Sequence, residues 1–275
     1  MKVLKFGGGC LKDAGAIKKI PSILKQYDKN TIIVISAFGK LTNFLEEISS
    51  KKPIDFSKAK ILFKQIMHDL SFNQEDSDKI LHDVKPLDPS LAAILSIGEL
   101  VSSKILSKHL QNHSIQHVLI NAIAIIKTSN KGINAPVNWK ETQRASQIIK
   151  TLMDQNSEKT ILTQGFISSY SKDGERSITC LGREGSDYSA AILGSVFNVD
   201  EVILFKDVDG IYSSDPKINN DAELFSALSY DQAFALCEQG NTVIHPKTIA
   251  PLKEKSIPLI IKNFNNIALP GTVIT

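Results

Sequence analysis

Short, strongly apolar segments alternate with longer segments of helical periodicity along most of this chain, and no other feature restricts its possible folds as much. The apolar segments are rich in Val, Ile, Leu and Phe and end in polar residues or glycine, which is typical of short buried strands. The predicted strands are Lys2–Phe6, Thr31–Ser36, His117–Asn121, Thr160–Gln164, Glu201–Lys206 and Leu259–Asn263. Strands that alternate with helices predict an α/β fold in which helices cover both faces of a mainly parallel sheet.

The predicted helices lie between these strands. The first covers Asp13–Tyr27, with Asp13 as its cap and Pro21 as the point where it would kink or split. Others are predicted over Leu91–Leu110, Trp139–Met153 and Asp187–Phe197. The charged stretch Lys51–Leu87 also has a helical pattern, and we interpret residues 51–115 as a helical lobe inserted in the α/β domain.

Two segments predict turns or loops instead. Tyr170–Thr179 indicates a hairpin that turns at Asp173-Gly174, and Tyr212–Leu224 indicates an exposed loop.

The composition excludes several classes of protein. The chain has 275 residues, enough for one large domain or two small ones. With 32 Lys and Arg against 29 Asp and Glu, the net charge of +3 provides no basic surface for nucleic acid. Its 3 cysteines are too few and too scattered for a disulfide framework or a zinc knuckle. No apolar run approaches the roughly 20 residues of a membrane span, and the stretch after Met1 is too short for a signal peptide. We therefore expect a cytoplasmic protein without nucleic-acid or membrane partners.

Glycines dominate the end of the first predicted strand. Gly7, Gly8 and Gly9 let the backbone approach a ligand and expose N–H groups, while the following helix directs its positive end to the same place. Lys5 adds a cation, so the combination suits triphosphate oxygens. The tripeptide alone is more typical of a plain strand-to-helix turn. Neither a P-loop nor a G-x-G-x-x-G fingerprint is present.

A second glycine-rich turn, at 181–187, runs directly into an alanine-rich helix. Arg183 offers a fork for a carboxylate, and Ser186 lies at the helix N-terminus, where anions are favoured. Asp187 falls in the first helical turn, where an isolated acidic residue is more typical of a cap.

Further polar segments follow predicted strands or interrupt a helix. Lys206–Pro216 is an acid-bearing loop after a buried strand, and Ser36–Asn43 follows the second strand. In open α/β sheets ligands bind outside the carboxyl ends of the strands, although the Lys206–Pro216 loop is also consistent with a solvated turn. Glu99 lies in an otherwise apolar helix, where it is either exposed or directed at a cationic ligand group.

Taken together and in this order, these segments resemble the amino acid kinase family, and within it the aspartokinases. The matching motifs are K-F-G-G at 5–8, S-A-x-x-x-x-T-N at 36–43, G-E at 98–99, L-G-R-x-G-S-D at 181–187, D-V-D-G with D-P at 207–216, H-P-x-T at 245–248 and G-T at 271–272. Glutamate 5-kinase, N-acetylglutamate kinase and UMP kinase share the fold but match these loops less well. The resemblance implies a three-layer αβα sandwich of the amino acid kinase (carbamate kinase-like) type.

The resemblance also implies an activity, which is phosphorylation of the side-chain carboxylate of L-aspartate by ATP with Mg²⁺. The product, 4-phospho-L-aspartate, begins the pathway to lysine, threonine and methionine. A homodimer is expected. Aspartokinases usually continue into regulatory ACT domains beyond the G-T motif, whereas this chain ends at Thr275. We therefore expect no regulatory domain in the chain and no inhibition by lysine or threonine.

The family's functional residues map onto positions of this chain. By resemblance, Lys5 balances charge on the transferring phosphoryl group, and Asp187 orients Lys5 and the reacting groups. Arg183 binds the α-carboxylate of aspartate, Glu99 binds its amino group, and the rest of that pocket is formed by Ser36, Thr42, Phe166 and Ser186. The nucleotide contacts are Gly7, Gly8, Gly9, Asp207, Tyr212 and Lys217. No protein-held metal is implied, because Mg²⁺ would arrive with ATP.

Four positions depart from the family pattern. Gly9 replaces the usual Thr or Ser, Glu184 replaces a glycine, and Lys206 replaces a threonine. Thr242 stands where the family has a phosphate-binding lysine, and Lys206 would restore that charge, so both are added to the predicted nucleotide contacts. These changes keep two alternatives open, a non-catalytic protein that binds nucleotide or amino acid, and a kinase for another small carboxylate.

Overall fold

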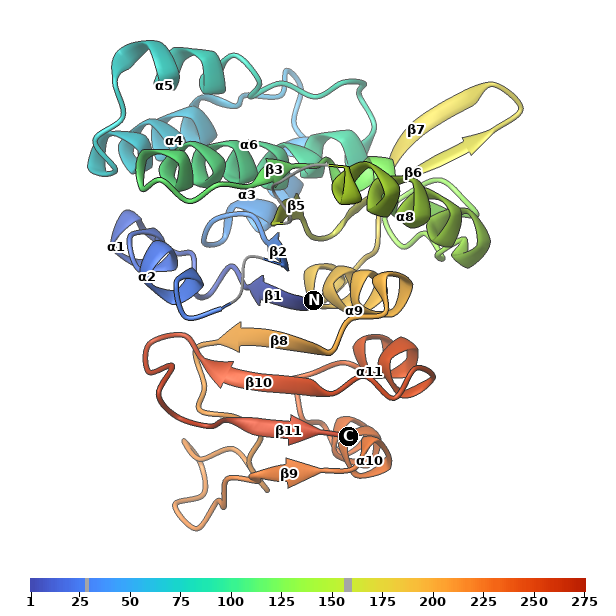
Figure 1. Ribbon diagram of the computed structural model, residues 1–275. Coiled ribbons are helices and arrows are strands. Elements are labelled where there is room, and N and C mark those ends of the chain that lie inside the picture. Colours follow the sequence, from blue (N-terminus) through green and yellow to red (C-terminus); the bar gives the residue numbers. More distant parts are fainter. Residues whose placement is uncertain (28–29, 156–159) are drawn as a thin grey trace.

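The computed structural model describes residues 1–27, 30–155 and 160–275. An eight-stranded sheet passes through the molecule in the order β3-β5-β2-β1-β8-β10-β11-β9 (Figure 1). Its strands are β1 (Lys2–Phe6), β2 (Thr31–Ile35), β3 (Val118–Leu119), β5 (Ile161–Gln164), β8 (Glu201–Lys206), β9 (Ala227–Leu228), β10 (Leu259–Asn263) and β11 (Thr272–Ile274). The pairing is parallel except between β10 and β11, which confirms the mainly parallel sheet.

A three-stranded sheet lies beside it, in the order β4-β6-β7. Its strands are β4 (Lys127–Thr128), β6 (Ile167–Lys172) and β7 (Glu175–Cys180). Strands β6 and β7 form the predicted hairpin, which projects from the body of the protein (Figure 1). Its turn places Asp173 and Gly174 at positive φ, as a tight hairpin turn requires.

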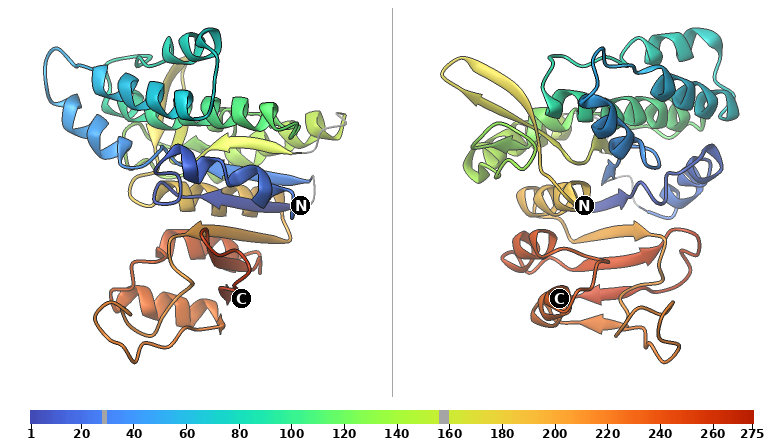
Figure 2. Two further views of the ribbon diagram at one scale, coloured as in Figure 1. Left: turned by 90° about the vertical axis from the view of Figure 1, so that its left-hand side faces the viewer. Right: turned by 180° about the vertical axis from the view of Figure 1, so that it is seen from behind.

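Helices cover both faces of the large sheet (Figure 2). They are α1 (Ala14–Ile17), α2 (Ile20–Leu24), α3 (Leu41–Ser49), α4 (Ser57–Asp69), α5 (Gln74–Leu81), α6 (Leu91–Asn112), α7 (Ala122–Ile125), α8 (Trp139–Asp154), α9 (Gly185–Phe197), α10 (Tyr230–Glu238) and α11 (Pro246–Lys253). Within the described residues, none of them is long and apolar enough to cross a membrane.

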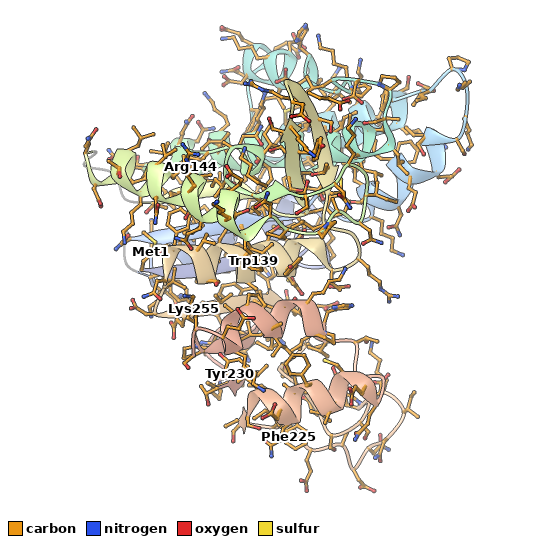
Figure 3. The ribbon with its side chains drawn as sticks, turned by 90° about the vertical axis from the view of Figure 1, so that its right-hand side faces the viewer. Met1, Trp139, Arg144, Phe225, Tyr230 and Lys255 are labelled. Carbon is orange, nitrogen blue, oxygen red and sulfur yellow. The ribbon has the colours of Figure 1, made fainter. Side chains whose placement is uncertain are left out.

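Strand β1 shows how the layers are built, because its side chains alternate between two hydrophobic clusters. Leu4 and Phe6 pack in one cluster with α1 to α6, and Val3 packs in the other with α8, α9 and α11. Figure 3 views the second side, where Trp139 and Arg144 belong to α8 and Tyr230 begins α10. The alternation of period two in a sheet buried on both sides produces the three-layer αβα arrangement.

Several predicted elements differ in their bounds. The helix predicted over Asp13–Tyr27 begins at its expected cap, Asp13, but divides into α1 and α2 between Lys18 and Lys19 rather than at Pro21. Pro21 lies in the first turn of α2, where its missing N–H has no intrahelical partner to lose. The helical character of Lys51–Leu87 is present as α4 and α5.

Helices α3, α7, α10 and α11 were not predicted. Helix α3 begins inside the polar Ser36–Asn43 segment, which we interpreted only as a loop. Helix α11 begins at Pro246 and contains Pro251, a residue that normally ends a helical pattern. It forms because buried residues on one side, including Ile249 and Leu252, pack against the sheet.

Candidate active site

A cavity of about 740 Å³ opens where β1, β2 and β8 end and α9 begins. Parallel strands bring their carboxyl ends to one edge, so loops that are distant in the sequence meet there. The predicted site residues in its wall are Lys5, Gly7, Gly8, Gly9, Ser36, Thr42, Glu99, Phe166, Arg183, Ser186, Asp187, Lys206 and Asp207. Tyr212, Lys217 and Thr242 do not line it.

Asp187 is the electrostatic centre of this cavity. Its side chain is 1% exposed, with Oδ1 lying 2.5 Å from Lys5 Nζ and Oδ2 lying 2.7 Å from Lys206 Nζ. Burial by itself raises the pKa of Asp187, but the two lysines outweigh burial and lower that pKa to about 2. The carboxylate is therefore ionised at neutral pH and holds two ammonium groups at the end of the sheet.

The interpretation of Asp187 as a helix cap is wrong. The N-cap of α9 is Glu184, in a left-handed conformation with φ of 54°, and its side chain makes no capping hydrogen bond. Asp187 is directed instead to the lysines of β1 and β8. Its position in the first turn of α9 does not serve to cap the helix. It brings a carboxylate to the ends of both strands.

Glu99 supplies a second buried carboxyl group to the cavity wall. It lies on α6 and is 2% exposed, so it is not a surface residue between apolar stripes. Its Oε1 accepts a hydrogen bond of 3.4 Å from the Ala37 N–H, and within the described chain Oε2 is buried without a partner. Burial raises the pKa of Glu99 to about 8. A cationic ligand group beside Oε2 would stabilise the ionised form and supply the missing partner.

The raised pKa of Glu99 predicts a specific pH dependence of stability. The folded protein keeps this proton up to about pH 8, whereas the unfolded chain loses it near 4.5. The contribution to stability is therefore complete below the unfolded pKa and is lost as the pH rises through the folded pKa. Relative to Glu99→Gln, the free energy of unfolding of the wild type should decrease by a few kcal/mol across this window, because each pKa unit corresponds to ~1 kcal/mol.

Urea unfolding of both proteins at several pH values measures this difference. Glu75→Gln, on the exposed surface of α5, is the control for removal of a carboxylate. A difference between wild type and Glu99→Gln that stays constant across the window would contradict the prediction.

The glycine loop after β1 is folded tightly against its neighbours. The N–H groups of Cys10 and Leu11 each donate to the Gly7 carbonyl at 3.0 Å. A Cβ added to Gly8 would lie 2.9 Å from the Gly39 carbonyl oxygen, so the loops after β1 and β2 approach closely at this glycine. Cys10 donates its thiol proton to the Phe205 carbonyl, and burial raises its pKa to about 11. Cys10 is therefore a protonated thiol that fixes the loop to β8.

The remaining predicted residues divide into two groups. Phe166 is held at φ of 66° by a hydrogen bond of 2.9 Å from its N–H to Ser189 Oγ, and it lines the cavity beside Ser186. Tyr212 instead donates its hydroxyl to Asp209 at 3.2 Å, outside the cavity wall. Lys217 and Thr242 are exposed.

Some lining residues were not predicted. They include Cys10, Asn43, Glu46, Ile133 and Asn134, together with Glu184, which the sequence analysis identified only as a departure from the family pattern. Asn134 belongs to the loop between β4 and α8, which carries no motif. Its Oδ1 occupies the space where a Cβ on Gly182 would project, so the glycine is the only signal of this contact. Within the described residues no group of three or more His, Cys, Asp or Glu side chains is placed to hold a metal ion.

Comparison with known proteins relates this chain to a family and to named relatives. The model of the amino acid kinase family matches residues 1–263. The chain is 30% identical to the bifunctional aspartokinase/homoserine dehydrogenase of Buchnera aphidicola, covering 100% of this chain and 36% of that protein. It is 29% identical to the chloroplastic aspartokinase 2 of Arabidopsis thaliana, covering 99% of this chain and 54% of that protein. The chain thus spans about a third to half of the length of these relatives.

Solved structures extend the similarity to the fold. Aspartate kinase of Clostridium acetobutylicum superposes with a TM-score of 0.81 at 27% identity, covering 100% of this chain and 63% of that one. Aspartokinase III of E. coli, in complex with lysine and aspartate, superposes with a TM-score of 0.85 at 25% identity, covering 100% and 64%. The uridylate kinase of Archaeoglobus fulgidus, at 18% identity and a TM-score of 0.53, shares the fold alone.

Proposed function

Because this chain belongs to the amino acid kinase family, we propose that it transfers the γ-phosphoryl group of ATP to the side-chain carboxylate of L-aspartate. The observation that carries the proposal is the Lys5–Asp187–Lys206 cluster, which lies in one cavity with the glycine loop and Glu99. The names of the relatives, which all include aspartokinase, support aspartate as the acceptor.

The proposed reaction needs positioning and charge neutralisation more than covalent participation by the protein. A carboxylate oxygen of aspartate attacks the γ-phosphorus, the bond from the γ-phosphorus to the bridging oxygen breaks, and ADP leaves with the electron pair. The acceptor is already an anion at neutral pH, so no general base is required. Lys5, held by Asp187, neutralises charge on the transferring group, and the N–H groups of Gly7, Gly8 and Gly9 bind phosphate oxygens.

The substrate side of the cavity fits an amino acid. Arg183 is exposed in the turn just before α9, where its guanidinium can bind the α-carboxylate in two hydrogen bonds. Glu99, whose buried Oε2 has no partner among the residues that the structure describes, would bind the amino group. Ser36, Thr42, Phe166 and Ser186 complete this pocket. A dicarboxylate without an amino group would leave Glu99 Oε2 without a partner and should be a poor substrate.

Mg²⁺ would enter as the complex with ATP, bound mainly by phosphates and water. Asp207 fits the role of an additional ligand, because its carboxylate lines the cavity next to Gly9. We propose that Tyr212, Lys217 and Thr242 contact the nucleotide beyond the cavity wall, and only the family resemblance supports these three. That resemblance also supports a homodimer, a cytoplasmic location and a place at the start of lysine biosynthesis.

The decisive experiment measures ADP release with MgATP and L-aspartate and traps the acyl phosphate as its hydroxamate. We expect turnover that requires aspartate and is much weaker with succinate, which lacks the amino group. Asp187→Ala is the control for contaminating kinases. Aspartate-dependent signal no higher than in that variant would reject the proposal, and ligand-dependent thermal stabilisation without turnover would instead indicate a binding protein.

A further inference from the structure

Glu184 and Lys206 form a charge pair at the phosphate side of the cavity. Glu184 Oε2 lies 3.9 Å from Lys206 Nζ, and the two side chains are 39% and 15% exposed. Lys206 ends β8 and Glu184 is the N-cap of α9, so the pair joins the two elements whose ends form this part of the wall. Both residues line the cavity.

The charges around Asp187 explain why Lys206 attracts a second anion. Asp187 is a single carboxylate shared by Lys5 and Lys206, so the three groups together carry one excess positive charge. Asp187 is only 1% exposed, whereas Lys206, which also lines the cavity, is 15% exposed. An anion that enters from the cavity therefore meets Lys206. Among the described residues, Lys206 already pairs there with Glu184 at 3.9 Å, in addition to its closer pair with Asp187 at 2.7 Å.

Glu184 is placed to leave this contact easily. Its side chain makes no hydrogen bond to the backbone of α9. The separation of 3.9 Å from Lys206 is beyond hydrogen-bonding distance, so the attraction is electrostatic only. Two anions competing for one ammonium group repel each other, and the more highly charged one, a polyphosphate, would displace the carboxylate.

We propose that Lys206 is a polyphosphate-binding residue of this pocket and that Glu184 is its counter-ion in the free protein, which nucleotide phosphate must displace. The two residues would then have opposite effects on nucleotide affinity, because Lys206 increases it and Glu184 decreases it. This inference rests on the proposed use of a nucleotide, but not on aspartate being the acceptor.

A double-mutant cycle on ADP and ATP binding tests the pair. Calorimetric titrations without aspartate compare wild type, Glu184→Gln, Lys206→Met and the double variant. We expect Lys206→Met to weaken binding by about 10-fold or more, as loss of a charge-assisted contact to phosphate implies. Glu184→Gln should strengthen binding by about 3- to 10-fold, because a partly exposed ion pair no longer has to be broken. In the Lys206→Met background the same Glu184→Gln change should have almost no effect.

Two further variants separate this mechanism from simpler ones. Glu46→Gln removes a negative charge from the same cavity at α3, and Glu46 has no ion pair with Lys206 among the contacts of the described chain. It should therefore change nucleotide affinity less than Glu184→Gln. Lys206→Arg keeps the charge and should retain most of the affinity. Thermal unfolding of each variant identifies any loss of affinity that comes from misfolding.

The inference is overturned if the effects of Glu184→Gln are equal in both backgrounds, if Glu46→Gln strengthens binding as much, or if the wild type binds neither nucleotide. These outcomes differ from failure of the proposed function. Coupled effects on nucleotide binding together with absent aspartate phosphorylation would leave the charge pair established and the acceptor wrong. Aspartate phosphorylation together with additive effects of the two substitutions would leave the acceptor established and the charge pair wrong.

Discussion

Replacing Asp187 with asparagine is expected to reduce kcat for aspartate-dependent ADP formation by about 10³-fold or more, the scale on which loss of a preorganised charge acts in an active site. Asparagine keeps the volume of the side chain but loses the charge that holds two ammonium groups, with contacts at 2.5 and 2.7 Å. Without it Lys5 and Lys206 repel each other, and neither keeps its position beside the glycine loop. Stopped-flow or steady-state measurement of ADP release determines the change.

The same variant should also be less stable. Removing one member of a buried ion pair leaves uncompensated charge, which typically costs about 3–5 kcal/mol. Asp231→Asn is the matched control, because Asp231 pairs with Lys253 on the surface and is 82% exposed. That change should cost less than ~1 kcal/mol and leave kcat unaltered. An Asp187→Asn protein with kcat within an order of magnitude of the wild type would contradict the role assigned to this carboxylate.

Asp187 also shows where prediction from the sequence reaches its limit. Its position in the first turn of α9 could be read from the sequence, and a cap was the natural interpretation of that position alone. Its true partners, Lys5 and Lys206, lie near the carboxyl ends of two neighbouring strands that are far apart in the chain. Only pairing of β1 with β8 brings them together, and no local pattern reports the register of that pairing. The family resemblance, unlike local reasoning, associated Asp187 with Lys5, and the two side chains form an ion pair in the structure.

The sheet was easier to predict than its surroundings. Strands β1, β8 and β10 match their predicted bounds because continuous apolar runs between polar ends are typical of strands buried on both faces. The short strands β4, β9 and β11 were missed, since two or three residues carry no periodicity. Helix α11 was hidden by Pro251, and its formation depends on packing that the sequence does not display.

The glycine loop gives the second large expected effect. A Cβ on Gly8 would lie 2.9 Å from the Gly39 carbonyl oxygen and 3.1 Å from that of Ala37, and both are backbone atoms that cannot rotate away. Gly8→Ala should therefore force apart the loops after β1 and β2. We expect kcat/KM for ATP to fall by about 10²-fold, because small displacements of positioning groups have effects of that size.

Gly9→Ala is the comparison that isolates this cause. A Cβ on Gly9 would meet Asp207 at 3.7 Å, an ordinary van der Waals contact, and the N–H available to phosphate is retained. Both variants add one methyl group to the same loop, so flexibility and volume change alike and only the collision differs. Overpacking of about 1–3 kcal/mol should lower the Tm of Gly8→Ala by roughly 2–10 °C, with a much smaller decrease for Gly9→Ala. If the two variants lost activity and stability equally, the close approach of the loops would not be what requires glycine at position 8, and its role would have to lie in backbone freedom that both glycines share.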